Sequence, residues 1–405
     1  MTTLKLDPGA ALLLDALHGA GHAAYAVGGC VRDSLLGLDP HDWDLCTSAR
    51  PEQVMALFGE EKCIPTGLQH GTVTVKQGGR LYETTTFRTE GAYSDGRHPD
   101  AVCFVPDVRE DLARRDFTIN AMAYSAEEGL IDPFGGRDDL AAHLVRAVGE
   151  PERRFEEDAL RILRLYRFAA RFGFSIDPPT AQAAQELCAH LDCVSVERIE
   201  EELAKLLTAP APAAYLNEKI LGVVLPELSP EALAAAKPVV DACPAGEQAL
   251  PVRLAALLLS LGEDGTRRTL RRLRCSNACI EETAVLVREV VSGVPVSLNI
   301  YARRLLGKYN LCTVQRLAAL GTALQPERSA DFAALSELAE QLDADGVCCR
   351  ISQLAVNGRD LMAAGVPAGP GIRKVLEALL DGVIREEYPN ERQALLAAVQ
   401  QLAAS

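Results

Sequence analysis

The sequence predicts an α+β protein in which a small mixed sheet at the N-terminus is followed by helices alone. Residues 1–145 contain short runs rich in Val, Thr, Tyr and Phe, whereas Ala, Leu, Glu and Arg dominate from residue 146 onward. A chain of 405 residues is too long for one hydrophobic core, so several domains are expected. Pro-containing loops divide the helical part. We therefore expect a head at 1–145, a neck at 146–205, a body at 206–293 and a tail at 294–405.

The strands expected in the head are bounded by Gly, Pro or Asp, as strand ends commonly are. They cover residues 23–29, 42–48, 71–77 and 80–88. A helix is expected between the second and third strands, at 51–58, because Pro51 suits a first helical position. This alternation predicts the α/β character of the head.

The composition indicates a globular protein of the cytoplasm. The formal net charge is −15, which points away from a nonspecific coat for nucleic acid. Arginines are nevertheless clustered at 153–171 and at 267–274, so a local basic groove stays open. The longest apolar runs, such as 254–261, are too short to cross a bilayer, and the N-terminus has no signal-peptide pattern. We expect a cytoplasmic enzyme or binding protein with no membrane partner.

The twelve cysteines include no CxxC pair, and their spacings argue against a zinc site. Without a secretory signal, we interpret them as reduced thiols that mostly fill the core. No zinc is expected.

The stretch DPHDWDLCTS, residues 39–48, places Asp42 and Asp44 two residues apart. In a strand, both carboxylates would share one face while Trp43 and Leu45 point into the core. Two neighbouring carboxylates repel each other, and Mg²⁺ is a hard cation that suits such oxygen ligands. The alternative is a solvated acidic turn, because a DxD pattern alone is common.

The residues upstream favour the metal site. VGGCVRD, at 27–33, puts Gly28 and Gly29 after an apolar strand, where backbone N–H groups can approach a phosphate closely. Arg32 adds a cation beside that turn. The alternative for the glycine pair alone is a tight turn, but the order of strand, glycine pair, arginine and DxD suits a triphosphate held against metal.

These motifs resemble the class II tRNA nucleotidyltransferases and their poly(A) polymerase relatives, within the DNA polymerase β superfamily. The matching stretches follow the family's order: VGGCVRDSLLGLDPHDWDLCTS, EDLARRDFTINAMAY (110–124), IDPFGGRDDL (131–140), EDALRILRLYRFAARFGF (157–174) and ERIEEEL (197–203). The resemblance covers at least residues 23–203. It implies a polymerase β-like nucleotidyltransferase head on helical neck, body and tail domains.

The resemblance also implies roles for individual residues. Asp42 and Asp44 would be the catalytic metal ligands, and Gly29, Arg32 and Arg115 would bind the nucleotide. Asp116 and Asn120 would organise the loop or the sugar. Glu83 is a candidate third carboxylate, with an exposed strand acid as an equal alternative.

In the neck, Asp158, Arg161 and Arg164, and nearly also Arg167 and Arg171, recur at three- and four-residue spacing, so we expect them on one helical face. Few acids lie on the same face as these arginines, so we expect an external anion to bind there. The alternative is a salt-bridged surface helix without a ligand. By resemblance, Asp158 and Arg161 would present a fixed edge to the incoming base. Arg164 and Arg167 would contact its phosphates and ribose.

The implied reaction is template-independent addition of CCA to the 3′ end of tRNA. The RNA 3′-hydroxyl would attack the α-phosphate of CTP or ATP with two Mg²⁺ held by Asp42 and Asp44, and pyrophosphate would leave. A polar segment between residues 88 and 114 resembles the loop that CC-adding enzymes of the family lack. The alternatives are an A-adding enzyme, a poly(A) polymerase and a non-catalytic RNA-binding scaffold.

The helical remainder offers two further RNA-binding candidates. In 266–276, Leu270 and Leu273 can face inward while arginines line a surface suited to tRNA phosphates. The turn at 369–371, followed by Arg373 and Lys374, could hold a phosphate or simply begin a helix. No His-Asp pair follows residue 253 in RLAALLLSLGEDG, so no phosphohydrolase activity is expected.

Overall fold

The computed structural model describes residues 3–90, 102–290 and 298–402. The chain forms two compact units, Met1–Glu227 and Leu228–Ser405. The first unit holds the predicted head and neck and the beginning of the predicted body. The four-part division itself stays a prediction.

Unit 1 is built on a seven-stranded mixed sheet with the strand order β3-β4-β5-β2-β1-β8-β9. The strands are β1 (Ala24–Val27), β2 (Leu45–Thr47), β3 (Cys63–Gly67), β4 (Thr72–Gln77), β5 (Arg80–Thr86), β8 (Ala123–Ser125) and β9 (Gly129–Ile131). All neighbours are antiparallel except β2 and β5, which run parallel. Four of these strands lie where the sequence predicts them, and β3, β8 and β9 were missed.

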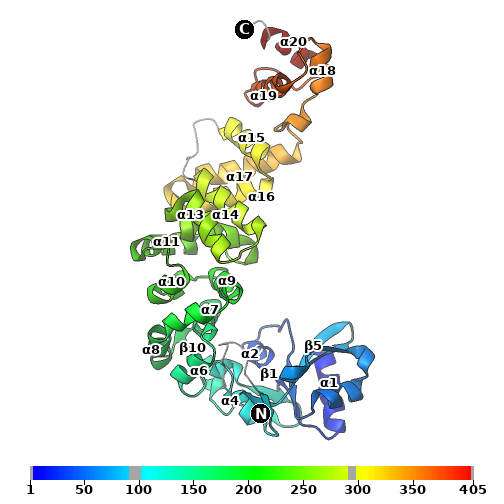
Figure 1. Ribbon diagram of the computed structural model, residues 1–405, viewed down its shortest axis with the longest axis vertical. Coiled ribbons are helices and arrows are strands. Elements are labelled where there is room, and N and C mark those ends of the chain that lie inside the picture. The colour runs from blue at the N-terminus through cyan, green and yellow to red at the C-terminus, as the bar shows by residue number, and fades with distance from the viewer. Residues whose placement is uncertain (1–2, 91–101, 291–297, 403–405) are drawn as a thin grey trace. The chain divides into compact units, whose positions relative to one another are not determined.

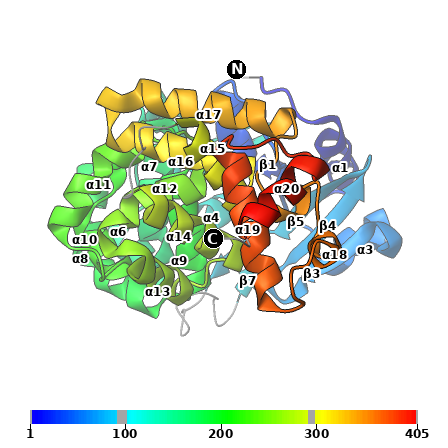
Figure 2. The same cartoon turned by 90° about the horizontal axis from the view of Figure 1, so that it is seen from above.

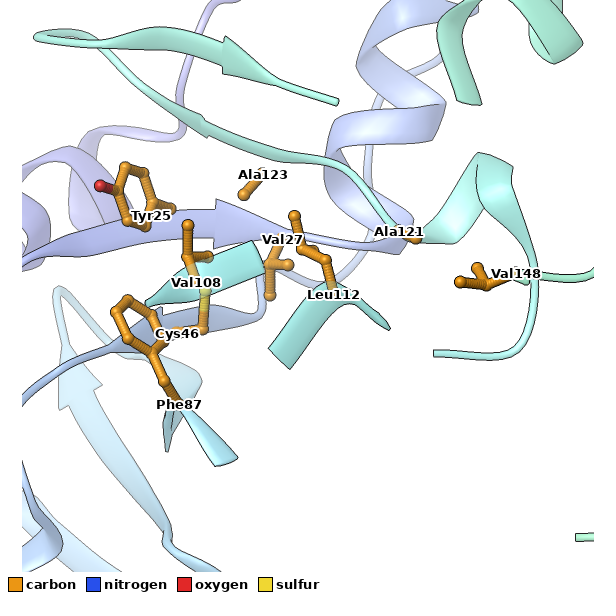
Figure 3. Close-up of a cluster of buried hydrophobic side chains, with 9 residues drawn as sticks. All are labelled: Tyr25, Val27, Cys46, Phe87, Val108, Leu112, Ala121, Ala123 and Val148. Carbon is orange, nitrogen blue, oxygen red and sulfur yellow. The ribbon is translucent and has the colours of Figure 1, made fainter. Parts of the chain in front are cut away.

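Both faces of the central strand β1 are buried, since every residue of Ala24–Val27 is inaccessible. Helix α1 (Pro8–Gly19) packs on one face with helix α3 (Pro51–Phe58), which has the bounds that the sequence predicts. On the other face, Val108 and Leu112 of α4 (Val108–Ala113) pack with Tyr25 and Val27, as Figure 3 shows. Strand β1 is thus packed on both faces.

The segment at 88–114 is more structured than the predicted polar loop. Its ends form a hairpin of β6 (Arg88–Glu90) and β7 (Val102–Phe104), followed by α4. The tip of the predicted loop, residues 91–101, lies outside the described residues.

After the sheet, unit 1 contains α6 (Pro151–Glu157), α7 (Leu160–Phe172), α8 (Pro178–Glu186) and α9 (Val196–Leu207) among its helices. Helix α7 packs against α9, and a short parallel pair, β10 (Leu144–Val145) and β11 (Ser175–Ile176), lies beside α7. Helix α2 (Gly29–Leu35) follows β1, α5 (Gly136–Ala141) precedes β10, and α10 (Glu218–Val224) ends the unit. Most of these elements carry labels in Figure 1: α2, α6, α7, α8, α9, α10 and β10.

Unit 2 is helical throughout its described residues. Its helices are α11 (Pro230–Ala242), α12 (Leu250–Leu258), α13 (Gly262–Arg272), α14 (Asn277–Val290), α15 (Leu298–Lys308), α16 (Leu311–Leu324), α17 (Ser329–Ala344), α18 (Gly358–Ala363), α19 (Pro370–Ile384) and α20 (Arg392–Leu402). Figure 2 shows them from a second direction. The last three enclose a small core around Leu361, Leu379 and Leu395. Eight of the twelve cysteines are buried, as predicted for small core residues.

Candidate nucleotidyltransferase site

The predicted DxD pair lies immediately before β2. Asp42 and Asp44 are exposed while Trp43 and Leu45 are buried, so the expected alternation of faces is present. The strand itself is shorter than predicted, because it begins only at Leu45. One backbone bond extends the pairing: the N–H of Val27 donates to the carbonyl of Asp44 at 2.9 Å. The two carboxylates therefore project from one fixed edge of the sheet.

A third carboxylate comes from the neighbouring strand. The parallel register pairs Leu45 with Thr84, which brings the preceding residues, Asp44 and Glu83, side by side. Glu83 is exposed, whereas its neighbours Tyr82 and Thr84 are buried. The structure thus brings Glu83 to the DxD edge, a relation that the sequence left open.

The surroundings of Asp44 disfavour its ionised form. Partial desolvation by the surrounding protein, together with the charges of Glu83 and Asp42, raises the pKa of Asp44 to about 6, against the opposing charge of Arg115. The side chain is nevertheless open to solvent. A group of like charges that water can reach but cannot fully hydrate is the environment in which a divalent cation binds.

The donor set fits Mg²⁺ only with help from outside the protein. Among the described residues, no three His, Cys, Asp or Glu side chains are arranged to hold a metal ion by themselves. Mg²⁺ commonly takes one or two protein carboxylates and completes its octahedron with water and substrate phosphate. Asp42 and Asp44, with hard oxygen donors at an open edge, meet that requirement.

Arg115 faces the same edge from the far side of the glycine turn. Gly28 has a φ of 75°, and a Cβ placed there would lie 2.9 Å from Nη1 of Arg115. A residue with a side chain would therefore be strained at Gly28 and would displace the arginine. Nη2 of Arg115 lies 3.4 Å from Asp111, while its buried Nε has no hydrogen-bond partner in the described residues. Neighbouring residues thus position Arg115, but the described residues leave part of its hydrogen-bonding capacity unused.

Arg32 lies deeper than the sequence suggests. Only 4% of it is exposed, and its guanidinium donates to Asp33, with Nε at 2.8 Å, and to the side-chain oxygen of Asn120. Gly29 begins α2 beside it. Both residues stay predicted nucleotide ligands, but in this structure the guanidinium of Arg32 is bonded to Asp33 and Asn120 inside the protein.

Asp158 does not lie on the helix face where the sequence places it. Helix α6 ends at Glu157 and α7 begins at Leu160, and Asp158 between them has extended backbone angles. Its carboxylate accepts from the N–H of Leu160 at 3.1 Å and from Arg198 at 2.8 Å. The expectation of one continuous helix is wrong because an aspartate that bonds nearby backbone N–H groups favours a helix start over a helix interior.

Arg161 is 8% exposed and occupies the first turn of α7. Its guanidinium donates to Glu157 at 2.8 Å and to the carbonyls of Arg154 and Arg114, at 3.1 and 3.0 Å. It thus joins the neck to the residue before Arg115. The predicted pairing of Asp158 with Arg161 at a base edge stays a prediction, with both groups ordered by other residues.

Arg164 and Arg167 follow on α7, where they meet acids from distant segments. Arg164 donates to Asp116 with Nε and Nη2, at 3.0 and 2.6 Å, and lies 3.6 Å from Glu202. Nε of Arg167 lies 2.7 Å from the other oxygen of Glu202. The expectation that these arginines meet few acids is wrong, because counting charges along one helix misses carboxylates supplied by other segments.

Asp116 joins the two halves of the site. It follows Arg115, is buried, and accepts from Asn120 at 3.0 Å as well as from Arg164. Although burial opposes ionisation, Arg164 and Asn120 hold the pKa of Asp116 well below its ordinary value. Arg115 thus faces the acidic edge and Asp116 the arginines of α7.

Three known protein families match separate segments of this chain. Residues 24–146 match the poly A polymerase head domain family, 173–231 match the RNA and SrmB-binding site family of polymerase A, and 252–399 match the tRNA nucleotidyltransferase domain 2 family. The fold and the acidic edge thus define a nucleotidyltransferase with a poly(A) polymerase-type head, a class whose members generally depend on a divalent metal.

The whole chain is also similar to individual enzymes. It is 37% identical to the CCA-adding enzyme of Limosilactobacillus fermentum, with 96% of both chains covered, and 36% identical to that of Geobacillus stearothermophilus, with 95% of this chain and 94% of the other covered. The solved CCA-adding enzyme of Bacillus stearothermophilus in complex with CTP superposes with a TM-score of 0.83 at 32% identity, covering 98% of each chain. The chain belongs to the CCA-adding enzyme family. None of its described helices has the length and apolarity to span a membrane.

Proposed function

We propose that this protein adds CCA to the 3′ end of tRNA in the cytoplasm, using CTP and ATP with Mg²⁺. The observation that carries the proposal is the acidic edge of Asp42 and Asp44 beside Arg115 and the glycine turn, in a chain of this family. Similarity over almost the entire length to enzymes named CCA-adding supports the choice of reaction over a poly(A) polymerase.

Asp42 and Asp44 would hold the metal, with Glu83 close enough to Asp44 to raise its pKa. A bound divalent cation would lower the pKa of the attacking 3′-hydroxyl and neutralise charge on the leaving triphosphate oxygens. The protein's own contribution is to position and to compensate charge. Arg115 would face the phosphates across the Gly28–Gly29 turn.

We assign recognition of the base and the sugar to the neck. Asp158 and Arg161 would present an acceptor and a donor to the Watson–Crick edge, in place of a template strand. Arg164 is the most open of the three arginines, with 32% of its side chain exposed, so it can reach phosphate or ribose. Arg167 would support it.

We place part of the tRNA contact on α13, in unit 2. Leu270 and Leu273 are buried while Arg268, Arg271 and Arg272 are exposed, which agrees with the amphipathic pattern. Exposed arginines in such a row suit RNA phosphates.

The decisive experiment offers the purified protein, with Mg²⁺, one tRNA in three forms: ending at the discriminator base, after C, and after CC. Each form receives CTP, ATP or both. Growth of the shortest form by three nucleotides and no further supports CCA addition. Extension of the CC form alone would identify an A-adding enzyme, a long adenosine ladder a poly(A) polymerase, and no product a scaffold.

A further inference from the structure

Two phenylalanines on α7 form a parallel stack under the arginine face. The rings of Phe168 and Phe172 have centroids 6.3 Å apart and an interplanar angle of 2°. Arg164, Phe168 and Phe172 follow one another at four-residue spacing, so they lie along one side of the helix. Phe168 is 4% exposed, so its ring is surrounded by protein.

Four guanidinium groups lie against these two rings. Arg167 is 4.0 Å from the centroid of Phe168, and Arg164 is 5.4 Å from it. Arg32, from α2, lies 5.2 Å from Phe168 and 4.9 Å from Phe172, and Arg171 lies 5.0 Å from Phe172. All these distances fall within the range of cation–π attraction. Phe168 thus touches every predicted nucleotide-binding arginine of this group: Arg32, Arg164 and Arg167.

Carboxylates from other segments pair with these arginines. Asp33 pairs with Arg32 and Arg171, Asp116 with Arg164, and Glu202 with Arg164 and Arg167. The charge of Asp158 also acts on Arg164. Neighbouring cations are costly unless they are compensated, and the negative faces of the two rings add to the attraction that the carboxylates provide.

We infer that Phe168 is a positioning residue for nucleotide binding: its ring fixes Arg32 of the head and Arg164 and Arg167 of the neck on one platform. This inference rests on the proposed function. An arginine side chain is flexible, and a guanidinium that is already stacked loses less freedom when a phosphate or base arrives. The benefit is the same before and during the reaction, so loss of the platform raises KM and leaves kcat nearly unchanged.

The test replaces Phe168 with phenylalanines carrying one, two and three fluorines on the ring. Fluorination weakens the negative face of the ring and barely alters its size. The matched control is Phe174, which is 4% exposed. Its ring stacks on His143 with centroids 5.0 Å apart and is tilted against Phe172 with centroids 5.4 Å apart, and no guanidinium lies over it among the described residues. The readouts are KM and kcat for CTP with the shortest tRNA, KM and kcat for ATP with the CC form, and CTP binding by equilibrium dialysis.

We expect the KM for both nucleotides to rise stepwise with fluorination of Phe168, to about ten-fold with three fluorines. The Phe174 series should stay flat. Phe168→Leu should raise KM by a similar factor. Phe168→Tyr keeps the aromatic face, so its KM should stay close to that of the wild type. A kcat that stays within two-fold throughout separates positioning from a folding defect.

The failures are distinguishable. An active wild-type enzyme whose KM is flat across the Phe168 series, or rises equally in the Phe174 series, overturns the platform and leaves the proposed function intact. A wild type that neither extends tRNA nor binds CTP overturns both.

Discussion

The acidic edge of the head and the arginine face of the neck differ in how far the fold compensates their charges. Asp42, Asp44 and Glu83 gather beside one arginine, and the pKa of Asp44 rises to about 6. On α7, arginines from one helix meet carboxylates from three other segments, and the pKa of Asp116 is held well below its ordinary value. One cluster is left uncompensated by the fold, and the other is nearly neutralised by it.

The difference indicates which partner each cluster awaits. An uncompensated group of carboxylates destabilises the free protein and is relieved by a divalent cation. A nearly balanced set of arginines is held in position by its ion pairs before a ligand arrives. Removing a carboxylate should therefore have opposite effects on stability in the two regions.

The largest effect is expected at the DxD pair. Asp42→Asn or Asp44→Asn should lower kcat for nucleotide addition on the order of 10³-fold or more, as loss of electrostatic stabilisation does at other active sites. The same variants should be as stable as the wild type or slightly more so without metal, because a repulsion is removed. Primer extension and thermal unfolding in EDTA measure the two quantities.

Asp39→Asn is the matched control for this pair, since Asp39 is an exposed acid of the same loop. It should leave kcat unchanged. An Asp44→Asn protein that keeps wild-type kcat would remove the acidic edge from the mechanism.

The next effect is expected at Asp116. Asp116→Asn leaves Arg164 facing a neutral partner in a buried position, so the free energy of unfolding should fall by about 3–5 kcal/mol, the usual result of breaking a buried ion pair on one side. Urea denaturation at pH 7 measures this loss. Asp192→Asn, at an exposed position of unit 1, provides the control. A loss at Asp116 no larger than at Asp192 would mean that the arginine face is balanced by other groups.

Local patterns in the sequence predicted the parts of the fold that depend on local chemistry. Strand and helix runs placed β1, β2, β4, β5 and α3, and alternation of faces around Trp43 was correct. Strands β8 and β9 were missed because a strand of three residues carries little periodicity; β2 is as short, and it was found through the longer run at 42–48.

What escaped prediction depends on contacts between distant segments. Glu83 comes beside Asp44 only through the parallel register of β2 and β5. Asp33 and Glu202 compensate the arginines of α7 from elsewhere in the chain. The four-residue spacing of Phe168 and Phe172 was visible beside the arginines, and it was the one local signal that could have indicated their platform.

A smaller effect is expected at Glu83. After desolvation, the charge of Glu83 is the largest cause of the raised pKa of Asp44. Glu83→Gln should therefore weaken Mg²⁺ binding and raise the Mg²⁺ concentration required by about ten-fold, within the range found when groups around a metal site are changed. The measurement is the Mg²⁺ concentration that gives half-maximal extension, compared with Glu60→Gln at another exposed acid of the head. Equal Mg²⁺ requirements in the two variants would make Glu83 an ordinary strand acid.

The smallest effect concerns stability against pH, and it tests the opposition of the two regions directly. Because the pKa of Asp44 is raised from 3.8 to about 6, the folded protein binds its proton more tightly than the unfolded chain does, and metal-free stability falls as the pH rises between these values. Asp44→Asn lacks this loss, so its stability relative to the wild type should increase from pH 4 to pH 7. The pKa of Asp116 is lowered instead, so the stability that Asp116 contributes is present above 3.8 and is lost as the pH falls below it. Denaturation of both variants in EDTA should be followed from below pH 3.8 up to pH 7, so that both windows are covered. Stability relative to the wild type should rise with pH above 3.8 for Asp44→Asn and fall with rising pH below 3.8 for Asp116→Asn. A flat curve for Asp44→Asn would mean that the acidic edge carries no repulsion for a metal to relieve.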